Sequence, residues 1–216
     1  MKIYLIRHGE SVLNGRNVIQ GQSDPPLSKT GVDQVELLAK SLTKEKFNFL
    51  YTSELMRAKQ TAEVLSKDLG LPISFHKDLA EIFLGEWEGK TPEEVNREYN
   101  SGYEKWRKNP TKTLIPGAEH IPEFRKRVSG TFRNILKNHS DDDNIIIVAH
   151  AGTITAIICH ILKGNFNKLI TRMSLTNTGI TYIQGYNKKL YITGINDSSH
   201  LCVSSLDAKE DIYLEK

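Results

Sequence analysis

Two apolar runs with no polar alternation mark the chain, and each ends abruptly in charged or imidazole side chains. The first covers residues 3–6 and is followed at once by Arg7 and His8. The second covers residues 145–149 and is followed by His150. Unbroken apolar runs are typical of strands buried on both faces of a parallel sheet. We therefore predict two such strands, which deliver two histidines to one edge of the sheet.

Apolar residues in the rest of the chain recur at the spacing of amphipathic helices. Helices are predicted at about residues 30–43, between Ser53 and Gly70, and at about 92–106, 119–138 and 152–163. Ser28, Ser53 and Thr91 stand where N-cap residues are expected. Further strands are predicted at residues 47–52, 73–75, 179–183 and 190–195, with a hairpin at 186–189 that joins the last two.

This alternation of strands and helices is typical of an α/β domain. We predict a doubly wound, mostly parallel sheet with helices on both faces, and an antiparallel edge formed by the late hairpin. The 216 residues are enough for one domain, expected at residues 1–201 with a helical insertion at about 90–138 and a C-terminal tail at 202–216. The polar loop at residues 11–28 is longer than an ordinary connection, which indicates a binding loop.

Composition narrows the range of partners. The 29 basic and 26 acidic residues leave a net charge of +3, a near balance that argues against nonspecific nucleic-acid binding. The only two cysteines, Cys159 and Cys202, have no metal-binding or redox spacing and fit a reducing compartment. Neither a signal peptide nor a membrane-length apolar run is visible. We expect a cytoplasmic protein with no membrane partner.

The residues at the strand ends suggest a phosphate site. Ligands of open α/β sheets bind beyond the carboxyl ends of the strands, so Arg7, His8 and His150 should meet there. Arg57, near the start of the helix after Ser53, should join them. Two arginines, two histidines and helix N-termini favour a dianion such as phosphate. The arginines would repel a cation, so no metal is expected.

Histidine itself is the best candidate nucleophile, because the chain contains no GxSxG elbow, P-loop or GxGxxG motif. We expect His8 to attack phosphorus and become phosphohistidine, with its other ring nitrogen held by a carbonyl in the turn after Gly9. Arg7, Arg57 and His150 would balance the charge on the transferring phosphoryl oxygens.

The leaving oxygen also needs a proton, which a carboxyl group near the site should supply. We assign this role to Glu81, and Glu10 and Glu86 are the alternatives. This chemistry requires neither a metal ion nor an organic cofactor. The expected substrate is a small-molecule phosphate ester, whose identity the residues do not specify.

Five segments in order resemble one known family, the histidine phosphatase superfamily, also called phosphoglycerate mutase-like. They are IRHGES at 6–11, TSELMRAKQTAE at 52–63, LAEIFLGEWEG at 79–89, PGAE at 116–119 and VAHAG at 148–152. The resemblance runs from residue 1 to about 201. It implies the phosphoglycerate mutase-like fold and activity on phosphate esters.

The resemblance also implies roles for individual residues. His8 matches the phosphorylated histidine, Arg7, Arg57 and His150 match the rest of the phosphate pocket, and Glu81 matches the acid. The positions that match the substrate side are Asn14, Gln20 and Gly21. Ala151 stands where the family often has glycine, and its backbone amide remains available to the substrate. Ala118 replaces the second glycine of the usual PGGE.

Two activities share such a pocket, phosphatase and cofactor-dependent phosphoglycerate mutase. The mutases of the family carry a long insertion with paired arginines, for which the 68 residues between Glu81 and His150 are too few. Arg125 and Arg127 are expected to be solvated on an amphipathic helix. We therefore favour a phosphatase, with a mutase as the alternative and a phosphate-binding module without catalysis as a third reading. The edge hairpin offers a surface for a homodimer.

Overall fold

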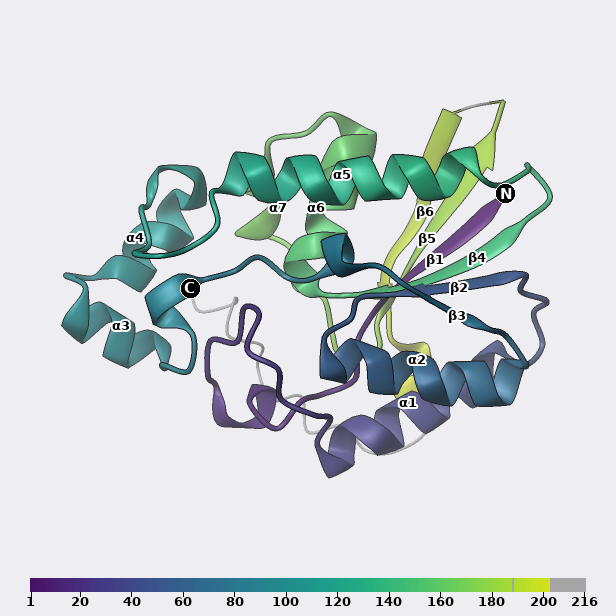
Figure 1. Ribbon diagram of the computed structural model, residues 1–216, viewed down its shortest axis with the longest axis horizontal. Coiled ribbons are helices and arrows are strands. Elements are labelled where there is room, and N and C mark those ends of the chain that lie inside the picture. Colours follow the sequence, from purple (N-terminus) through teal and green to yellow (C-terminus); the bar gives the residue numbers. More distant parts are fainter. Residues whose placement is uncertain (188, 203–216) are drawn as a thin grey trace.

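The computed structural model describes residues 1–187 and 189–202. A six-stranded sheet with the order β3-β2-β4-β1-β5-β6 lies at its centre (Figure 1). The strands are β1 (Lys2–Arg7), β2 (Phe49–Thr52), β3 (Ile73–Phe75), β4 (Asn144–Ala149), β5 (Ile180–Tyr186) and β6 (Lys189–Asp197). Strands β1 to β4 run parallel, and the β5–β6 hairpin forms the antiparallel edge. The predicted fold class is therefore confirmed; residue 188 of the hairpin lies outside the described residues.

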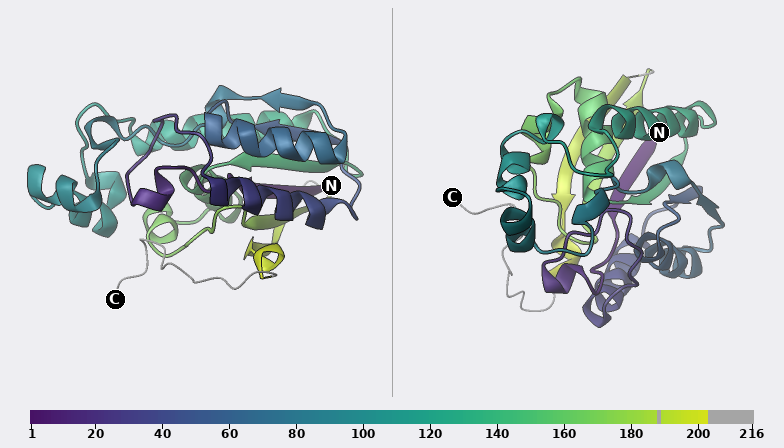
Figure 2. Two further views of the ribbon diagram at one scale, coloured as in Figure 1. Left: turned by 90° about the horizontal axis from the view of Figure 1, so that it is seen from below. Right: turned by 60° about the vertical axis from the view of Figure 1, so that its left-hand side comes forward.

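Helices cover both faces of this sheet, because its buried strands are apolar on both sides. On β1, Tyr4 and Ile6 pack with α1 (Lys29–Leu42) and α2 (Met56–Leu69). Ile3 and Leu5 point the other way and belong to the core that includes α5 (Ile121–Lys137), α6 (Ala151–Leu162) and α7 (Phe166–Ile170). Figures 1 and 2 show the sheet between these two layers. The predicted unbroken apolar runs thus reflect two separate cores.

One predicted helix is divided in two. The chain forms α3 (Pro92–Glu98) and α4 (Gly102–Lys108) where we predicted a single helix over about 92–106. Asn100 and Ser101 between them have φ values of 50° and 56°, in the left-handed region that a continuous helix excludes. Figure 1 shows α3 and α4 beyond the carboxyl ends of the central strands.

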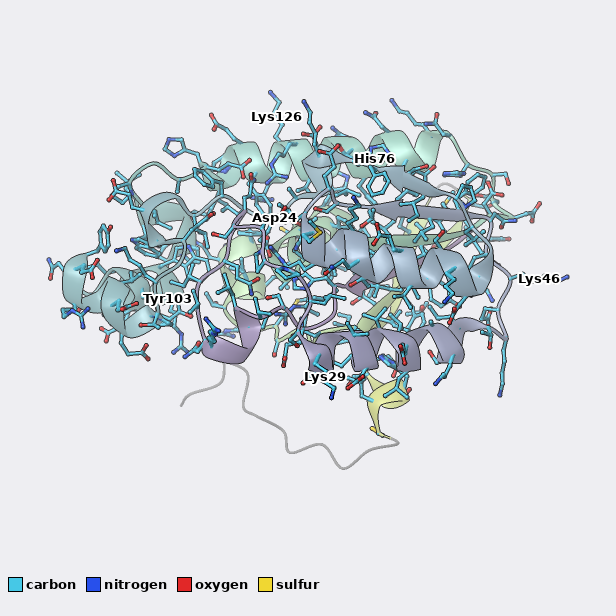
Figure 3. All side chains as sticks on the ribbon, turned by 60° about the horizontal axis from the view of Figure 1, so that its bottom comes forward. Asp24, Lys29, Lys46, His76, Tyr103 and Lys126 are labelled. Carbon is cyan, nitrogen blue, oxygen red and sulfur yellow. The ribbon has the colours of Figure 1, made fainter. Side chains whose placement is uncertain are left out.

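The helix N-termini follow the predicted caps at two of three places. Ser28 Oγ accepts from Gly31 N (3.0 Å), and Thr91 forms a capping box with Glu94. The Ser53 prediction is wrong, because α2 begins at Met56 and its N-cap, Leu55, offers no side-chain acceptor. Asp24 Oδ1 accepts from Met56 N instead, and Figure 3 shows Asp24 beside this end of α2.

Short 3-10 helices and loops complete the described chain. The 3-10 helices are Asn14–Arg16, Lys77–Leu79, Gly85–Trp87, Pro110–Lys112 and Ser199–Leu201. Helix α7 was not predicted from the sequence; Asn165 caps it by accepting from Lys168 N. Of the predicted tail at 202–216, residues 203–216 lie outside the described residues. Within the described part, no helix has both the length and the apolar character needed to cross a membrane.

Candidate active site

Sheet register brings the two histidines together. Strands β1 and β4 are paired with Arg7 opposite Ala149, so His8 and His150 leave the sheet side by side. His8 N donates to Ala149 O (3.0 Å), and the two imidazole centroids are 5.0 Å apart. His8 is 3% exposed and His150 is fully buried. The backbone hydrogen bonds of the sheet therefore fix the spacing of this pair.

The His8 ring is held in one tautomer. Its Nδ1 lies 2.7 Å from Gly9 O, and since a carbonyl only accepts, Nδ1 carries the proton. Nε2 is therefore unprotonated, and it accepts a hydrogen bond from Arg57 Nε at 3.2 Å. Burial and the charges of Arg57 and Arg7 hold the pKa of His8 well below its ordinary value. The ring is therefore neutral at neutral pH, as a nucleophile requires.

Glycine is needed in the turn beneath His8. A Cβ on Gly9 would lie 2.7 Å from Val35 Cγ2 and 2.8 Å from Gly31 O. The Gly9 amide donates to Thr61 Oγ1 (3.0 Å) in α2. The chain thus passes close to both α1 and α2, and this contact fixes the carbonyl that orients the His8 ring.

Arg57 reaches the same point from the first turn of α2. Its guanidinium donates to Ser23 O (2.7 Å) and Gly21 O (2.8 Å), so loop carbonyls fix its head beside His8. Burial lowers the pKa of Arg57 to about 10, which still leaves it protonated at neutral pH. Gly21 therefore contributes its carbonyl, and with a φ of 52° it leaves room for the Glu88 carboxylate.

Arg7 and His150 each have one buried nitrogen atom without a hydrogen-bond partner among the described residues. These atoms are Arg7 Nε and His150 Nδ1. Arg7 Nη1 donates to Leu175 O. Unpaired buried donors are costly unless a ligand accepts from them, and phosphate oxygens are strong acceptors. Arg7, His8, Arg57 and His150 therefore form a polar pocket suited to a dianion.

Ser53 orients the ring of His150. Ser53 Oγ accepts from Leu55 N (3.2 Å) and lies 2.9 Å from His150 Nε2. The hydrogen bond between the hydroxyl and Nε2 fixes the orientation of the imidazole ring and leaves Nδ1 without a partner among the described residues. Burial, followed by the charge of Arg57, keeps the pKa of His150 well below its ordinary value. The partnership with His150 also explains why Ser53 does not cap α2.

The Glu81 side chain meets the first turn of α6, the helix that begins directly after His150. Its carboxylate accepts from Ile82 N (2.9 Å) and from Gly152 N (2.9 Å). A Cβ on Gly152 would come within 2.4 Å of Glu81 Oε1, so this approach requires glycine. The negative charge of Glu81 is also close enough to act on Arg57. The Glu81 carboxylate therefore lies near the phosphate pocket, where it could donate a proton to the leaving group or accept one from water.

The two rival carboxylates are engaged elsewhere. Glu10 Oε1 accepts from Ser28 Oγ (2.7 Å), the residue that caps α1. Glu86 is exposed and accepts from Tyr99 OH (3.1 Å). Among the described residues, neither forms a hydrogen bond or ion pair with His8 or His150, so the geometry favours Glu81, whose carboxylate meets Gly152 N.

The predicted substrate loop is tied together by its own side chains. Asn14 Oδ1 accepts from Ser11 N (3.0 Å), and Gln20 Oε1 accepts from Ser11 Oγ (2.7 Å). These bonds hold the loop closed on itself. Ala151 begins α6 directly after His150, which places its backbone amide at the helix N-terminus beside the pocket.

A contact of Glu88 with the same loop was not predicted from the sequence. Its carboxylate accepts from Gln22 N (2.7 Å), Leu84 N (2.9 Å) and Ser23 Oγ (3.1 Å). It thereby joins the loop that carries Gly21 to the segment after Glu81. The motif LGEWEG contains Glu88, but its spacing does not show which distant amides it meets.

The prediction for Arg127 is wrong. Its side chain is only 19% exposed and forms an ion pair with Glu119, with Nε 2.6 Å from Oε1. Arg127 also donates to the carbonyls of three residues on the segment that carries the candidate acid: Asp78, Ala80 and Glu81. Arg125 is not simply solvated either, since it lies over the Phe166 ring, 5.5 Å from its centroid.

Comparison with known proteins identifies relatives of this chain. The sequence model of the histidine phosphatase superfamily (branch 1) matches residues 3–198. A protein named as a candidate phosphoserine phosphatase of Hydrogenobacter thermophilus is 33% identical over 199 residues, which cover 92% of this chain and 97% of that protein.

Solved structures agree with the sequence comparison. Bacillus stearothermophilus YhfR is 26% identical and superposes with a TM-score of 0.87 over 93% of this chain and 98% of that one. A mutant phosphoserine phosphatase of Entamoeba histolytica, solved in complex with phosphoserine, is 28% identical with a TM-score of 0.81 over 93% and 98% of the two chains.

Proposed function

Because the chain belongs to the histidine phosphatase superfamily and is a phosphatase of that type, we propose that it hydrolyses small phosphate monoesters through a phosphohistidine at His8. One observation carries the proposal. The Nδ1–H of His8 is committed to Gly9 O, which leaves Nε2 unprotonated beside the Arg57 guanidinium. A neutral imidazole with an unprotonated ring nitrogen in a fixed orientation, beside a cation, is what attack on a phosphoryl group needs.

In the first half-reaction, the Nε2 lone pair forms a bond to phosphorus while the bond from phosphorus to the ester oxygen breaks. Glu81, protonated at that stage, gives its proton to the departing oxygen, so the alcohol leaves neutral. Arg7, Arg57 and His150 donate to the transferring oxygens and balance their charge.

In the second half-reaction, water attacks the phosphohistidine and its proton passes to the Glu81 carboxylate. The bond from phosphorus to Nε2 breaks, inorganic phosphate forms, and the imidazole lone pair returns to His8. Glu81 therefore acts first as an acid and then as a base, and the enzyme ends in its starting state.

The class of substrate is inferred from the chemistry of the site and from the activities of related proteins. The names of relatives include phosphoserine phosphatase and alpha-ribazole phosphatase, so a phosphorylated small molecule of this kind is the first candidate. Phosphoserine heads the panel that we would test.

The test compares the wild-type protein with His8→Asn, using p-nitrophenyl phosphate and O-phosphoserine as substrates. We expect phosphate release by the wild type and almost none by the variant. Equal turnover by both proteins would overturn the role of His8, and no turnover by either would favour a phosphate-binding module. Isomerisation of 3-phosphoglycerate with added 2,3-bisphosphoglycerate, if faster than phosphate release, would establish a mutase instead.

The remaining expectations stay predictions. Activity should be insensitive to EDTA, since no step needs a metal ion, and activity lost on chelation and restored by a divalent ion would contradict this. We also propose a cytoplasmic location, which the free thiols of Cys159 and Cys202 support. The β5–β6 edge remains the candidate surface for a homodimer, which light scattering would test.

A further inference from the structure

Every N–H donor of Arg127 is used, although the residue lies outside the phosphate pocket. A guanidinium has five N–H donors. Two of them bond the Glu119 carboxylate, from Nε at 2.6 Å and from Nη2 at 2.9 Å. The other three reach the carbonyls of Asp78 (2.9 Å), Ala80 (2.8 Å) and Glu81 (2.8 Å). Such saturation is unusual for an arginine that is still 19% exposed.

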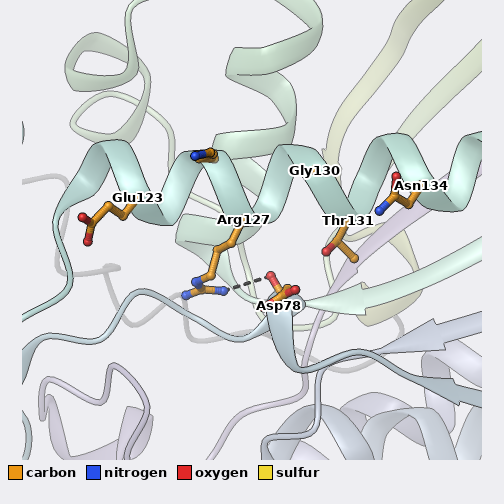
Figure 4. Close-up of a pocket in the computed structure, with 7 residues that line it drawn as sticks. Asp78, Glu123, Arg127, Gly130, Thr131 and Asn134 are labelled. Carbon is orange, nitrogen blue, oxygen red and sulfur yellow. Dashed lines mark hydrogen bonds between the residues drawn. The ribbon is translucent and has the colours of Figure 1, made fainter.

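The carbonyls that Arg127 binds belong to a segment with little regular structure. Residues 77–79 form one 3-10 turn, and Ala80 and Glu81 lie in an extended connection after it. No strand pairs with this connection in the described sheet. Arg127 reaches it from α5, and Figure 4 shows the side chain extending from that helix toward Asp78. The guanidinium thus replaces the hydrogen bonds that a neighbouring strand would provide.

Glu119 extends this support to the other side of Glu81. While it pairs with Arg127, its carboxylate also accepts from Phe83 N at 3.4 Å, and Phe83 O accepts from Glu119 N at 3.0 Å. The backbone is therefore held at Glu81 and again two residues later. Between these points, the Glu81 side chain turns toward Gly152 N.

We propose that Arg127, with Glu119 as its counterion, is the positioning residue that sets the Glu81 carboxylate for proton transfer. The inference rests on the proposed function, because it takes Glu81 as the acid and base of the reaction. Arg127 does not touch the pocket formed by Arg7, His8, Arg57 and His150. It acts on the chemistry through the backbone that carries Glu81, and a displacement of about 1 Å in such a group costs about 100-fold in rate. The charge of Arg127 also contributes to the lowered pKa of His150, and Arg127→Lys keeps that charge, so this variant separates the two effects.

The leaving group separates this role from a purely structural one. An alkyl phosphate must receive a proton as its oxygen departs, whereas p-nitrophenolate leaves readily as an anion. Loss of the acid therefore slows the alkyl phosphate far more than p-nitrophenyl phosphate. A general weakening of the fold or of the phosphate pocket slows both substrates together.

The experiment measures kcat/KM, which covers the steps up to release of the leaving group, for p-nitrophenyl phosphate and for the alkyl phosphate that the wild-type protein hydrolyses fastest. The variants are Arg127→Met, Arg127→Lys, Glu81→Gln and the double variant Glu81→Gln/Arg127→Met. Arg125→Met, on the same helix, is the matched control because Arg125 makes no contact with residues 78–81 among its described interactions.

We expect Arg127→Met to lower kcat/KM for the alkyl phosphate by about 100-fold and kcat/KM for p-nitrophenyl phosphate by less than about threefold, because hydrolysis of the phosphohistidine, which both substrates share, does not enter kcat/KM. Arg127→Lys should behave like Arg127→Met, because a single ammonium cannot reach three carbonyls and a carboxylate together. In the Glu81→Gln background the Arg127→Met change should add almost nothing, since both act through one group.

Different failures have different meanings. Equal losses for the two substrates in Arg127→Met, or a full additional loss in the double variant, would overturn the positioning role alone. If Glu81→Gln lowers the activity toward both substrates equally, the assignment of Glu81 as the acid is overturned, and the positioning role of Arg127 with it. If Arg127→Met does not fold, as judged by its thermal melt, Glu119→Gln replaces it and should show the same substrate dependence, while a uniform loss would contradict the proposal.

Discussion

The phosphate floor, formed by Arg7, His8, Arg57 and His150, and the rim, formed by residues 14–23 and 78–89, are built in different ways. In the floor, both histidines leave adjacent parallel strands whose register is set by the backbone. In the rim, single charged side chains bind backbone groups of irregular segments, as Glu88 does with Gln22 N and Leu84 N.

This difference corresponds to the two functions proposed for the site, binding of the phosphate group and selection of the substrate. The floor must hold a dianion and a nucleophile within tenths of an ångström, and a buried sheet edge provides such rigidity. In the proposed reaction the rim would face the part of the substrate that varies, and its long-range hydrogen bonds lie outside the sheet. Substitutions in the floor should therefore slow the turnover of every substrate. Substitutions in the rim should slow some substrates more than others.

The largest effect should come from removing charge from the floor. Arg57→Met takes away the cation beside His8 Nε2, and we expect kcat/KM to fall by about 10²- to 10³-fold for all phosphate esters, since loss of one fixed transition-state donor has this cost. Steady-state kinetics on an aryl and an alkyl phosphate would show it. A loss confined to one substrate class would place Arg57 with the rim.

A smaller effect concerns the burial of the floor histidines. The pKa values of His8 and His150 are held well below the ordinary value of about 6.5, so the unfolded chain binds more protons in the interval between the two values. Stability must therefore rise with pH there and fall as the pH drops below about 6.5, by up to about 1.4 kcal/mol per pH unit for each histidine.

Urea unfolding of the wild type and His8→Asn at several pH values tests this linkage. The free energy of unfolding of the wild type should increase more steeply with pH than that of the variant between pH 5 and 6.5. Parallel curves for wild type and His8→Asn would contradict a neutral, buried His8.

The smallest effect should come from the rim. Glu88→Gln removes a charge that accepts from Gln22 N, Leu84 N and Ser23 Oγ, and we expect kcat/KM to fall by roughly fivefold, which matches about 1 kcal/mol for a weakened hydrogen bond. Kinetics on the same two substrates would measure it. A loss as large as that of Arg57→Met would show that the floor depends on Glu88 as strongly as on its own arginine, and would contradict the distinction between floor and rim.

The sequence predicted the floor because its residues follow the strongest local signals. Arg7, His8 and His150 come directly after apolar runs, and parallel strands bring their carboxyl ends to one edge. The layers and the antiparallel hairpin followed from the same periodicity. The split between α3 and α4 was missed because asparagine and serine adopt left-handed conformations that hydrophobic spacing does not register.

The rim could not be predicted in the same way. Arg127 lies on the polar side of an amphipathic pattern, which says that it avoids the core but not which carbonyls it meets. Ser53 looked like a helix cap because local rules do not include His150, 97 residues away. Such partners are decided by tertiary contacts, so the sequence indicated the candidate acid Glu81 without showing what holds it.

The central claim is that His8 carries the phosphoryl group during turnover. Rapid acid-free quenching of the wild-type protein with a radiolabelled phosphate monoester, followed by proteolysis and peptide sequencing, tests it most directly. We predict label on the peptide that contains His8, stable to alkali and lost in acid, and no label on His8→Asn. Label on any other residue, or on none while the wild type turns over, would contradict the account.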